Sequence, residues 1–82
     1  METNEFTKQL TDMGYGAYRT EHKVCVTKDD IGIIAEVLRR VRYGMSIIPR
    51  AYRFSPSEWS EVISEEVVDL IVEYASTPTD ER

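Results

Sequence analysis

The last third of the chain carries the pattern that most restricts its fold. Its apolar side chains recur about every 3.6 residues, the period of a helix with one buried face: Trp59, Val62, Ile63, Val67, Leu70, Ile71 and Tyr74. Ser57 can cap this helix, with Glu58 in its first turn. Pro78 disfavours helical backbone at Thr77. The sequence therefore predicts an amphipathic helix over residues 57–76 that closes a small domain.

This helix has more apolar surface than one packing contact requires. Val68, Val72 and Ala75 widen the stripe on its apolar side. The surplus either buries more of the domain's own sheet or forms the seam of a homodimer, and the pattern alone allows both.

A shorter helix is predicted at the N-terminus. Its apolar residues follow a helical spacing: Phe6, Leu10 and Met13. Thr3 or Asn4 can cap its start. Gly14 or Gly16 can end it, because glycine readily adopts the left-handed backbone of helix ends.

Extended backbone is favoured between the two helices. Residues 15–27 read as one strand. Its solvent-facing side chains are predicted to be Thr20, His22 and Lys23. A turn follows at residues 28–32. Residues 45–54 read as another strand, which lies at a sheet edge or breaks at Pro49 because proline cannot donate to a strand ladder.

Residues 33–43 fit two patterns. As a helix, their stripe would consist of Ile31, Ile34, Leu38 and Val41. As a strand, one face would hold Ile33, Ala35, Val37 and Val41. The turn at residues 28–32 joins two β-rich runs, and that arrangement favours a hairpin. We interpret the segment as a strand.

Length and composition exclude several classes of protein. A chain of 82 residues buries only roughly 60–65% of its unfolded surface, which suits one domain. The single cysteine, Cys25, excludes an internal disulfide and a cysteine-based zinc site, and we expect it to be a small buried apolar side chain. The acidic N-terminus lacks a signal-peptide pattern, and no stretch approaches the roughly 18 apolar residues of a membrane span. We expect a cytoplasmic protein that binds no membrane.

The sequence contains no catalytic constellation. Its only histidine, His22, has no serine or cysteine nucleophile motif near it. The carboxylates of the closing helix are spaced as on a solvated face, whereas a catalytic pair would need a cleft. We expect no catalytic residue, no metal site, no cofactor and no enzymatic activity.

Charge is strongly segregated along the chain. The net charge of −5 divides into −2 for residues 1–16, +4 for residues 17–53 and −7 for residues 54–82. The acidic face of the closing helix is the first candidate partner-binding surface: Glu58, Glu61, Glu65, Asp69 and Glu73. The second is a patch of arginine and aromatic residues, the types that hold nucleic acids: Arg39, Arg40, Arg42, Arg50, Arg53, Tyr43 and Tyr52. Alternatively, these arginines pair with the acidic helix and with solvent. The overall acidity makes a dedicated nucleic-acid binder the weaker interpretation.

The final residues form a motif of the pattern Tyr-Ala-x-Thr-Pro-x-x-Glu-Arg. The matching residues are Tyr74, Ala75, Thr77, Pro78, Glu81 and Arg82. In this ending the chain resembles a group of small phage and prophage proteins of Gram-positive bacteria. The resemblance implies a strand-turn-strand portion upstream, which also favours a strand at residues 33–42, and it implies no catalytic residues. Physically, Thr77 and Pro78 suit the start of a short final turn, with Arg82 folded back on acids of the preceding helix.

These features predict an α+β fold of order α-β-β-β-α, with both helices on one face of a three-stranded antiparallel sheet. We expect a small phage- or prophage-derived accessory protein that binds a host or phage protein in the cytoplasm of the bacterial host. In its sharpest form this is an acidic inhibitor of a host nucleic-acid enzyme or defence complex. The alternatives are an RNA or single-stranded DNA binding module that uses the arginine-aromatic patch, and a structural homodimer.

Overall fold

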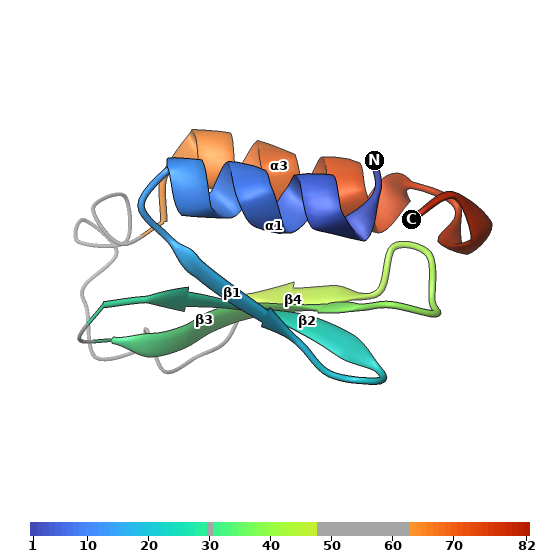
Figure 1. Cartoon of the computed structure of the whole chain (residues 1–82), viewed down its shortest axis with the longest axis horizontal. Helices are drawn as coiled ribbons and strands as arrows, with labels where there is room; N and C mark the ends of the chain where they lie inside the picture. Colours follow the sequence, from blue (N-terminus) through green and yellow to red (C-terminus); the bar gives the residue numbers. More distant parts are fainter. Residues whose placement is uncertain (30, 48–62) are drawn as a thin grey trace.

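The computed structural model describes residues 1–29, 31–47 and 63–82, in which two helices cover one face of a four-stranded antiparallel sheet (Figure 1). The elements are α1 (Thr3–Asp12), β1 (Gly16–Arg19), β2 (Lys23–Lys28), β3 (Gly32–Leu38), β4 (Met45–Ile47), α3 (Glu65–Ser76) and the 3₁₀ turn η2 (Thr79–Glu81). The strands are ordered β1-β2-β3-β4. None of the described helices is long and apolar enough to cross a membrane. The α+β class is confirmed, whereas the prediction of three strands is wrong.

The extra strand arises because residues 15–27 form a hairpin instead of one strand. The Thr20 hydroxyl accepts hydrogen bonds from the backbone N–H groups of His22 (3.3 Å) and Lys23 (3.2 Å). The Thr20 N–H donates to the Lys23 carbonyl at 2.8 Å. A threonine side chain that binds nearby backbone in this way favours a turn over a continuous strand. Thr20 and His22 therefore lie in the β1–β2 turn, and Lys23 begins β2.

The strand interpretation of residues 33–43 is confirmed for the part that forms β3. Ala35 and Val37 are buried on the helix-covered face, as predicted. The pairing of β2 with β3 shifts register between Val26 and Thr27, so one extra residue is accommodated on β3. Ile34 enters the core as a result, and Ile33 is only half-buried. Val41 lies beyond β3 in an exposed loop, so its predicted position on the strand face is wrong.

A Schellman motif ends α1. Gly14 has φ +86°, and its N–H donates to the Thr11 carbonyl at 3.0 Å. The Tyr15 N–H donates to the Leu10 carbonyl at 2.9 Å, which completes the motif. Gly14 is therefore the stop that the sequence allowed. At the other end neither predicted cap is used, because the N-cap is Glu2 and Thr3 is already helical.

The helix α3 begins at Glu65 instead of Ser57. Ser64 has extended backbone (φ −75°, ψ 157°), and its hydroxyl accepts a hydrogen bond from the Val67 N–H at 3.3 Å. Glu65 and Glu66 follow in the first turn, where carboxylates favour the helix dipole. A continuous helix through residue 64 is therefore wrong. Residues 57–62 of the predicted helix, and residues 48–54 of the predicted last strand, lie outside the described residues.

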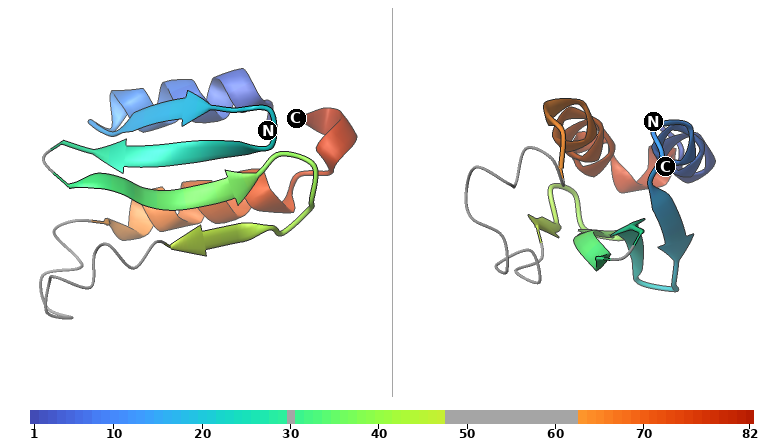
Figure 2. Two further views of the ribbon diagram at one scale, coloured as in Figure 1. Left: turned by 90° about the horizontal axis from the view of Figure 1, so that it is seen from below. Right: turned by 90° about the vertical axis from the view of Figure 1, so that its left-hand side faces the viewer.

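The core lies between the helices and the sheet, with α1 nearest β1 and α3 over β3 and β4 (Figure 2). The apolar stripe predicted for the closing helix is confirmed where it is described: Ile63, Val67, Leu70, Ile71 and Tyr74 are buried. The ring of Tyr74 stacks on that of Phe6 with centroids 4.2 Å apart, and Tyr74 and Thr3 share a 2.7 Å hydrogen bond between their hydroxyls. Cys25 is a buried free thiol. Met13 is more than one-third exposed and does not join the α1 stripe.

Candidate functional site

The C-terminal motif is an anchor for the chain's end. After α3 the chain turns through η2, and both termini lie at the same end of the molecule (Figure 2). The Arg82 guanidinium donates to the carbonyls of Leu38 (2.6 Å), Ala75 (2.7 Å) and Thr77 (3.0 Å). It also lies 4.9 Å from the centre of the Tyr74 ring. The prediction that Arg82 folds back on acids of the closing helix is wrong, because its partners are backbone carbonyls.

These contacts have a clear electrostatic reason. The last carbonyls of a helix have no partner within the helix and carry partial negative charge. Arg82 satisfies the Ala75 carbonyl, and Arg42 donates from Nε to the Ser76 carbonyl at 2.6 Å. Two arginines therefore cap α3 from outside, and each keeps its full positive charge.

The loop between β3 and β4 is fixed against the same helix end. The Tyr43 N–H donates to the Ala75 carbonyl at 2.7 Å, with Tyr43 in the left-handed backbone region (φ 64°). The Arg42 guanidinium lies 5.0 Å from the centre of the Tyr43 ring, which is 63% exposed. The structure thus provides one arginine-aromatic pair of the kind expected from the sequence.

Arg39 and Arg40 begin this loop. The backbone of Arg39 donates to the His22 carbonyl, and its Nη1 donates to the Thr20 carbonyl, both at 2.8 Å. These bonds hold Arg39 against the β1–β2 turn. Arg40 is exposed and has neither a hydrogen bond nor an ion pair within the described part of the chain.

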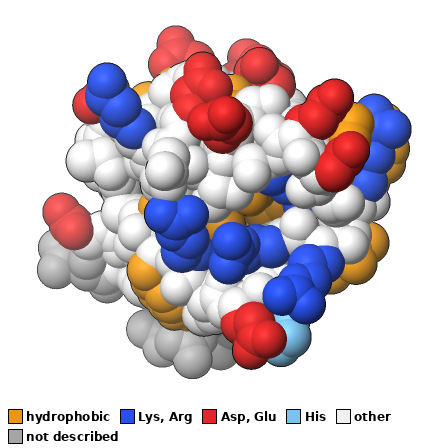
Figure 3. Space-filling view, turned by 45° about the vertical axis from the view of Figure 1, so that its right-hand side comes forward, with side chains coloured by type: hydrophobic (Ala, Val, Ile, Leu, Met, Phe, Trp, Pro, Cys, Tyr) orange, Lys and Arg blue, Asp and Glu red, His pale blue; other side chains and the backbone are white. Residues whose placement is uncertain are grey.

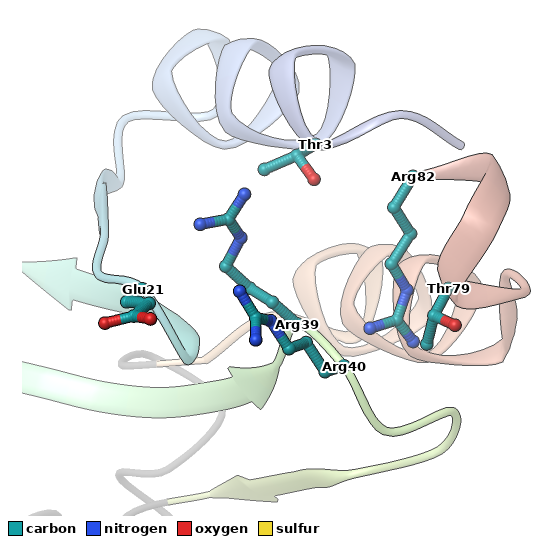
Figure 4. Close-up of a pocket in the computed structure, with 6 residues that line it drawn as sticks. All are labelled: Thr3, Glu21, Arg39, Arg40, Thr79 and Arg82. Atoms are coloured by element: carbon teal, nitrogen blue, oxygen red, sulfur yellow. The ribbon is translucent and has the colours of Figure 1, made fainter.

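Four separate segments meet in a pocket of about 240 Å³ (Figure 4). We call it the arginine pocket, and its lining residues are Thr3, Glu21, Arg39, Arg40, Thr79 and Arg82. They come from the start of α1, the β1–β2 turn, the β3–β4 loop and the C-terminal segment. In the space-filling view, basic side chains gather across the middle of this face, with acidic side chains above them over the helices (Figure 3).

The basic and acidic surfaces do not neutralise each other. Among residues 1–29, 31–47 and 63–82, ion pairs join Lys23 to Glu36 (2.7 Å) and His22 to Glu21 (3.9 Å). No arginine of these ranges lies within 4.0 Å of a carboxylate oxygen. The alternative in which the arginines pair with the acidic helix is therefore not what the described arginines do.

Carboxylates instead concentrate on the helix layer. Seven are exposed on α1, its cap and α3: Glu2, Glu5, Asp12, Glu65, Glu66, Asp69 and Glu73. The single basic residue of these two helices is Lys8. Of the carboxylates predicted for the acidic face, Glu65, Asp69 and Glu73 are exposed as expected, whereas Glu58 and Glu61 lie outside the described residues.

The arginine patch was predicted only in part. Arg39 and Arg40 share the pocket, and Arg42 and Tyr43 lie further along the same loop. Arg50, Arg53 and Tyr52 lie outside the described residues. Four further lining residues were not predicted: Thr3, Glu21, Thr79 and Arg82. No local sequence pattern predicts them, because the tertiary fold brings them together.

Among the described residues, two side chains with a shifted pKa lie on the face of the sheet opposite the helices. Hydrogen bonding to Glu36 raises the pKa of the Lys23 ammonium. Hydrogen bonding to Cys25, followed by desolvation, raises the pKa of the Tyr18 phenol. These residues lie on adjacent strands, and none of them lines the arginine pocket. In the described ranges, no group of three or more histidine, cysteine or acidic side chains could hold a metal ion.

No protein-family model, curated protein or solved structure matches the chain.

Proposed function

We propose that this protein is a small accessory protein that presents the carboxylates of α1 and α3 to the basic surface of a macromolecular partner. The observation that carries the proposal is the helix layer, where seven exposed carboxylates face solvent with Lys8 as the only basic residue. No carboxylate of this layer has an ion-pair partner among the described residues.

Such a surface favours a basic partner for two physical reasons. Like charges on neighbouring helices repel one another, and a cationic surface relieves this repulsion on contact. The field of the acidic layer also speeds the encounter with a positively charged groove. A groove that normally holds nucleic-acid phosphates is the natural match, because it is built to accept regularly spaced negative charge.

The partner in this proposal is a nucleic-acid enzyme or defence complex of a bacterial host, and the protein is its phage- or prophage-derived inhibitor. The phage origin is supported by the resemblance of the C-terminal motif, from Tyr74 to Arg82. The mode of action follows from the charge, since an acidic layer competes with nucleic acid for the same groove.

The experiment combines capture with competition. Tagged protein is incubated with bacterial lysate, and captured proteins are challenged with an added oligonucleotide. We expect the oligonucleotide to release the partner, and we expect the triple variant Glu65→Lys, Asp69→Lys, Glu73→Lys to capture none. A matched control reverses three exposed carboxylates outside α1 and α3 and should capture normally: Asp29, Asp80 and Glu81. Capture that survives the helix variant, or that ignores the oligonucleotide, contradicts the proposal.

A second candidate function is direct binding of RNA or single-stranded DNA. Its specific support is the exposed Tyr43 ring beside the Arg42 guanidinium, which is a surface on which a base could stack. Filter binding at low and high salt tests it, with Tyr43→Leu as the variant that removes the aromatic face. Failure to retain oligonucleotide at low salt eliminates this candidate.

The homodimer candidate has less support. Of the surplus apolar residues of α3, Ala75 is buried, Val68 packs against the core, and only Val72 is substantially exposed, at 43%. A monomer in sedimentation at high protein concentration would remove this candidate.

A further inference from the structure

We propose that the arginine pocket binds a single phosphoryl group. This inference is independent of the acidic helix layer, because it concerns the opposite charge at another part of the surface. The pocket is lined by three arginines, two threonines and one glutamate (Figure 4).

The pocket has hydrogen-bond donors to spare. A guanidinium has five N–H donors in a planar fork that matches phosphate oxygens. Arg40 uses none of them within the described chain, and the Arg39 side chain uses one, from Nη1 to the Thr20 carbonyl. The guanidinium groups of Arg39 and Arg40 can therefore donate bidentate, charge-assisted hydrogen bonds to the oxygens of one phosphoryl group.

The contacts that hold the pocket's arginines in place do not neutralise their positive charge. Arg82 binds three carbonyls at 3.0 Å or less, and carbonyls orient a guanidinium without cancelling its charge. Thr3 is the first residue of α1, so the positive end of that helix dipole also lies at the pocket wall. Glu21 is the one opposing charge in the lining.

Part of the site is already ordered before any ligand arrives. Arg82 is fixed by its carbonyl partners and by the Tyr74 ring, and Arg39 is tied to the β1–β2 turn. The Arg40 side chain has no such partner among the described residues. Such preorganisation lowers the entropic cost of binding.

The size of the pocket selects the ligand. At about 240 Å³ it is smaller than the roughly 300–1,000 Å³ of sites for drug-sized ligands. It suits one phosphoryl group better than a whole nucleotide. Free phosphate and the terminal phosphate of an oligonucleotide share this chemistry, and titration with each of them separates the two sources.

The test is an NMR titration of the full chain at constant ionic strength with three probes. They are inorganic phosphate, a short oligonucleotide with a 5′-phosphate, and the same oligonucleotide with a 5′-hydroxyl; sodium chloride serves as the reference salt. We expect saturable shifts of the Arg39, Arg40 and Thr79 amides and of the arginine Nε–H signals. Arg40→Gln should weaken binding about tenfold because it removes a charged fork. Its thermal unfolding should match that of the parent protein.

Two further variants make the test sharper. Glu21→Gln removes the opposing carboxylate and should strengthen binding about two- to fivefold. Lys8→Gln changes the net charge by the same amount as Arg40→Gln but lies on α1 outside the pocket, and should leave binding unchanged.

Two outcomes support the proposal. Saturation by inorganic phosphate alone identifies free phosphate as the source, and preference for the 5′-phosphorylated oligonucleotide identifies a terminal phosphate. Two outcomes overturn it. In the first, phosphate shifts are no larger than those of chloride and the two oligonucleotides also bind equally. In the second, Arg40→Gln leaves binding intact.

Discussion

At the residue scale, the Arg82 side chain connects the C-terminal segment to two other segments of the chain. Its guanidinium connects the end of β3 with the end of α3 and covers the Tyr74 ring. Each bond has a carbonyl as its acceptor, and hydrogen bonds to a charged group are worth more than neutral ones. The arginine of the C-terminal motif therefore has a structural role in this fold.

Arg82→Gln should lower the free energy of unfolding by about 2–3 kcal/mol, because several charge-assisted bonds are lost together. The free energy of unfolding of Arg82→Lys should lie between those of the parent protein and Arg82→Gln, since an ammonium keeps the charge without the planar fork. Urea denaturation measures both, with Arg40→Gln as the control that should change stability by less than about 0.5 kcal/mol. Equal stabilities for Arg82→Gln and Arg40→Gln would contradict the role assigned to Arg82.

At the element scale, local patterns predicted some boundaries and missed others for identifiable reasons. Gly14 and Gly16 were the two candidate stops of α1, so that boundary was readable to within two residues. The closing helix has two serine-acid starts, Ser57-Glu58 and Ser64-Glu65, and periodicity continues across both. The β1–β2 turn contains neither glycine nor proline; its signal is the Thr20 hydroxyl, which a strand pattern also tolerates.

The choice between the two helix starts is testable. Ser64→Ala removes the side chain that accepts from the Val67 N–H and should lower the free energy of unfolding by about 1 kcal/mol. Ser64→Asp should restore most of it, because aspartate accepts the same bond and its charge favours the helix N-terminus. Urea denaturation gives both values. A Ser64→Ala variant as stable as the parent would show that the helix does not depend on this cap.

The β2–β3 ladder makes a prediction about pH. The Lys23 ammonium is 2.7 Å from Glu36 Oε1, and this bond holds the pKa of Lys23 above its ordinary value. Because the folded pKa is the higher one, the pair contributes stability below the unfolded pKa, and this contribution is lost as pH rises through the folded pKa. NMR titration of the Lys23 side chain should therefore show a raised pKa, and Glu36→Gln should return it towards the ordinary lysine value. A Lys23 titration unaffected by Glu36→Gln would argue against the pair in solution.

At the scale of the whole molecule, the fold separates charge more than the sequence required. The segregated charges could have been neutralised by pairing the central arginines with the acidic helix. Arg42 and Arg82 do lie at the end of α3, yet both bind its carbonyls and leave the carboxylates unpaired. The arginine pocket also exists only at this scale, since Thr3 and Thr79 are 76 positions apart in the sequence but line one cavity.

This separation predicts how stability responds to salt. Repulsion among the helix-layer carboxylates destabilises the folded state and is screened within a Debye length of about 8 Å at physiological ionic strength. Raising sodium chloride from low to physiological concentration should therefore increase Tm by about 2–4 °C. Asp69→Asn lowers the charge of the layer and should reduce this increase, whereas Lys8→Gln raises its negative charge and should enlarge it.

Thermal unfolding of the parent protein and the two variants, followed by circular dichroism at several salt concentrations, measures these changes in Tm. Opposite responses of the two variants identify the helix layer as the source of the effect, because both substitutions are on exposed helix positions and differ in the sign of the charge removed. A Tm that is independent of salt, or that falls as salt is added, would mean that the carboxylates of α1 and α3 do not repel one another appreciably. The acidic layer would then gain little from a cationic partner, and the electrostatic basis of the proposed function would be lost.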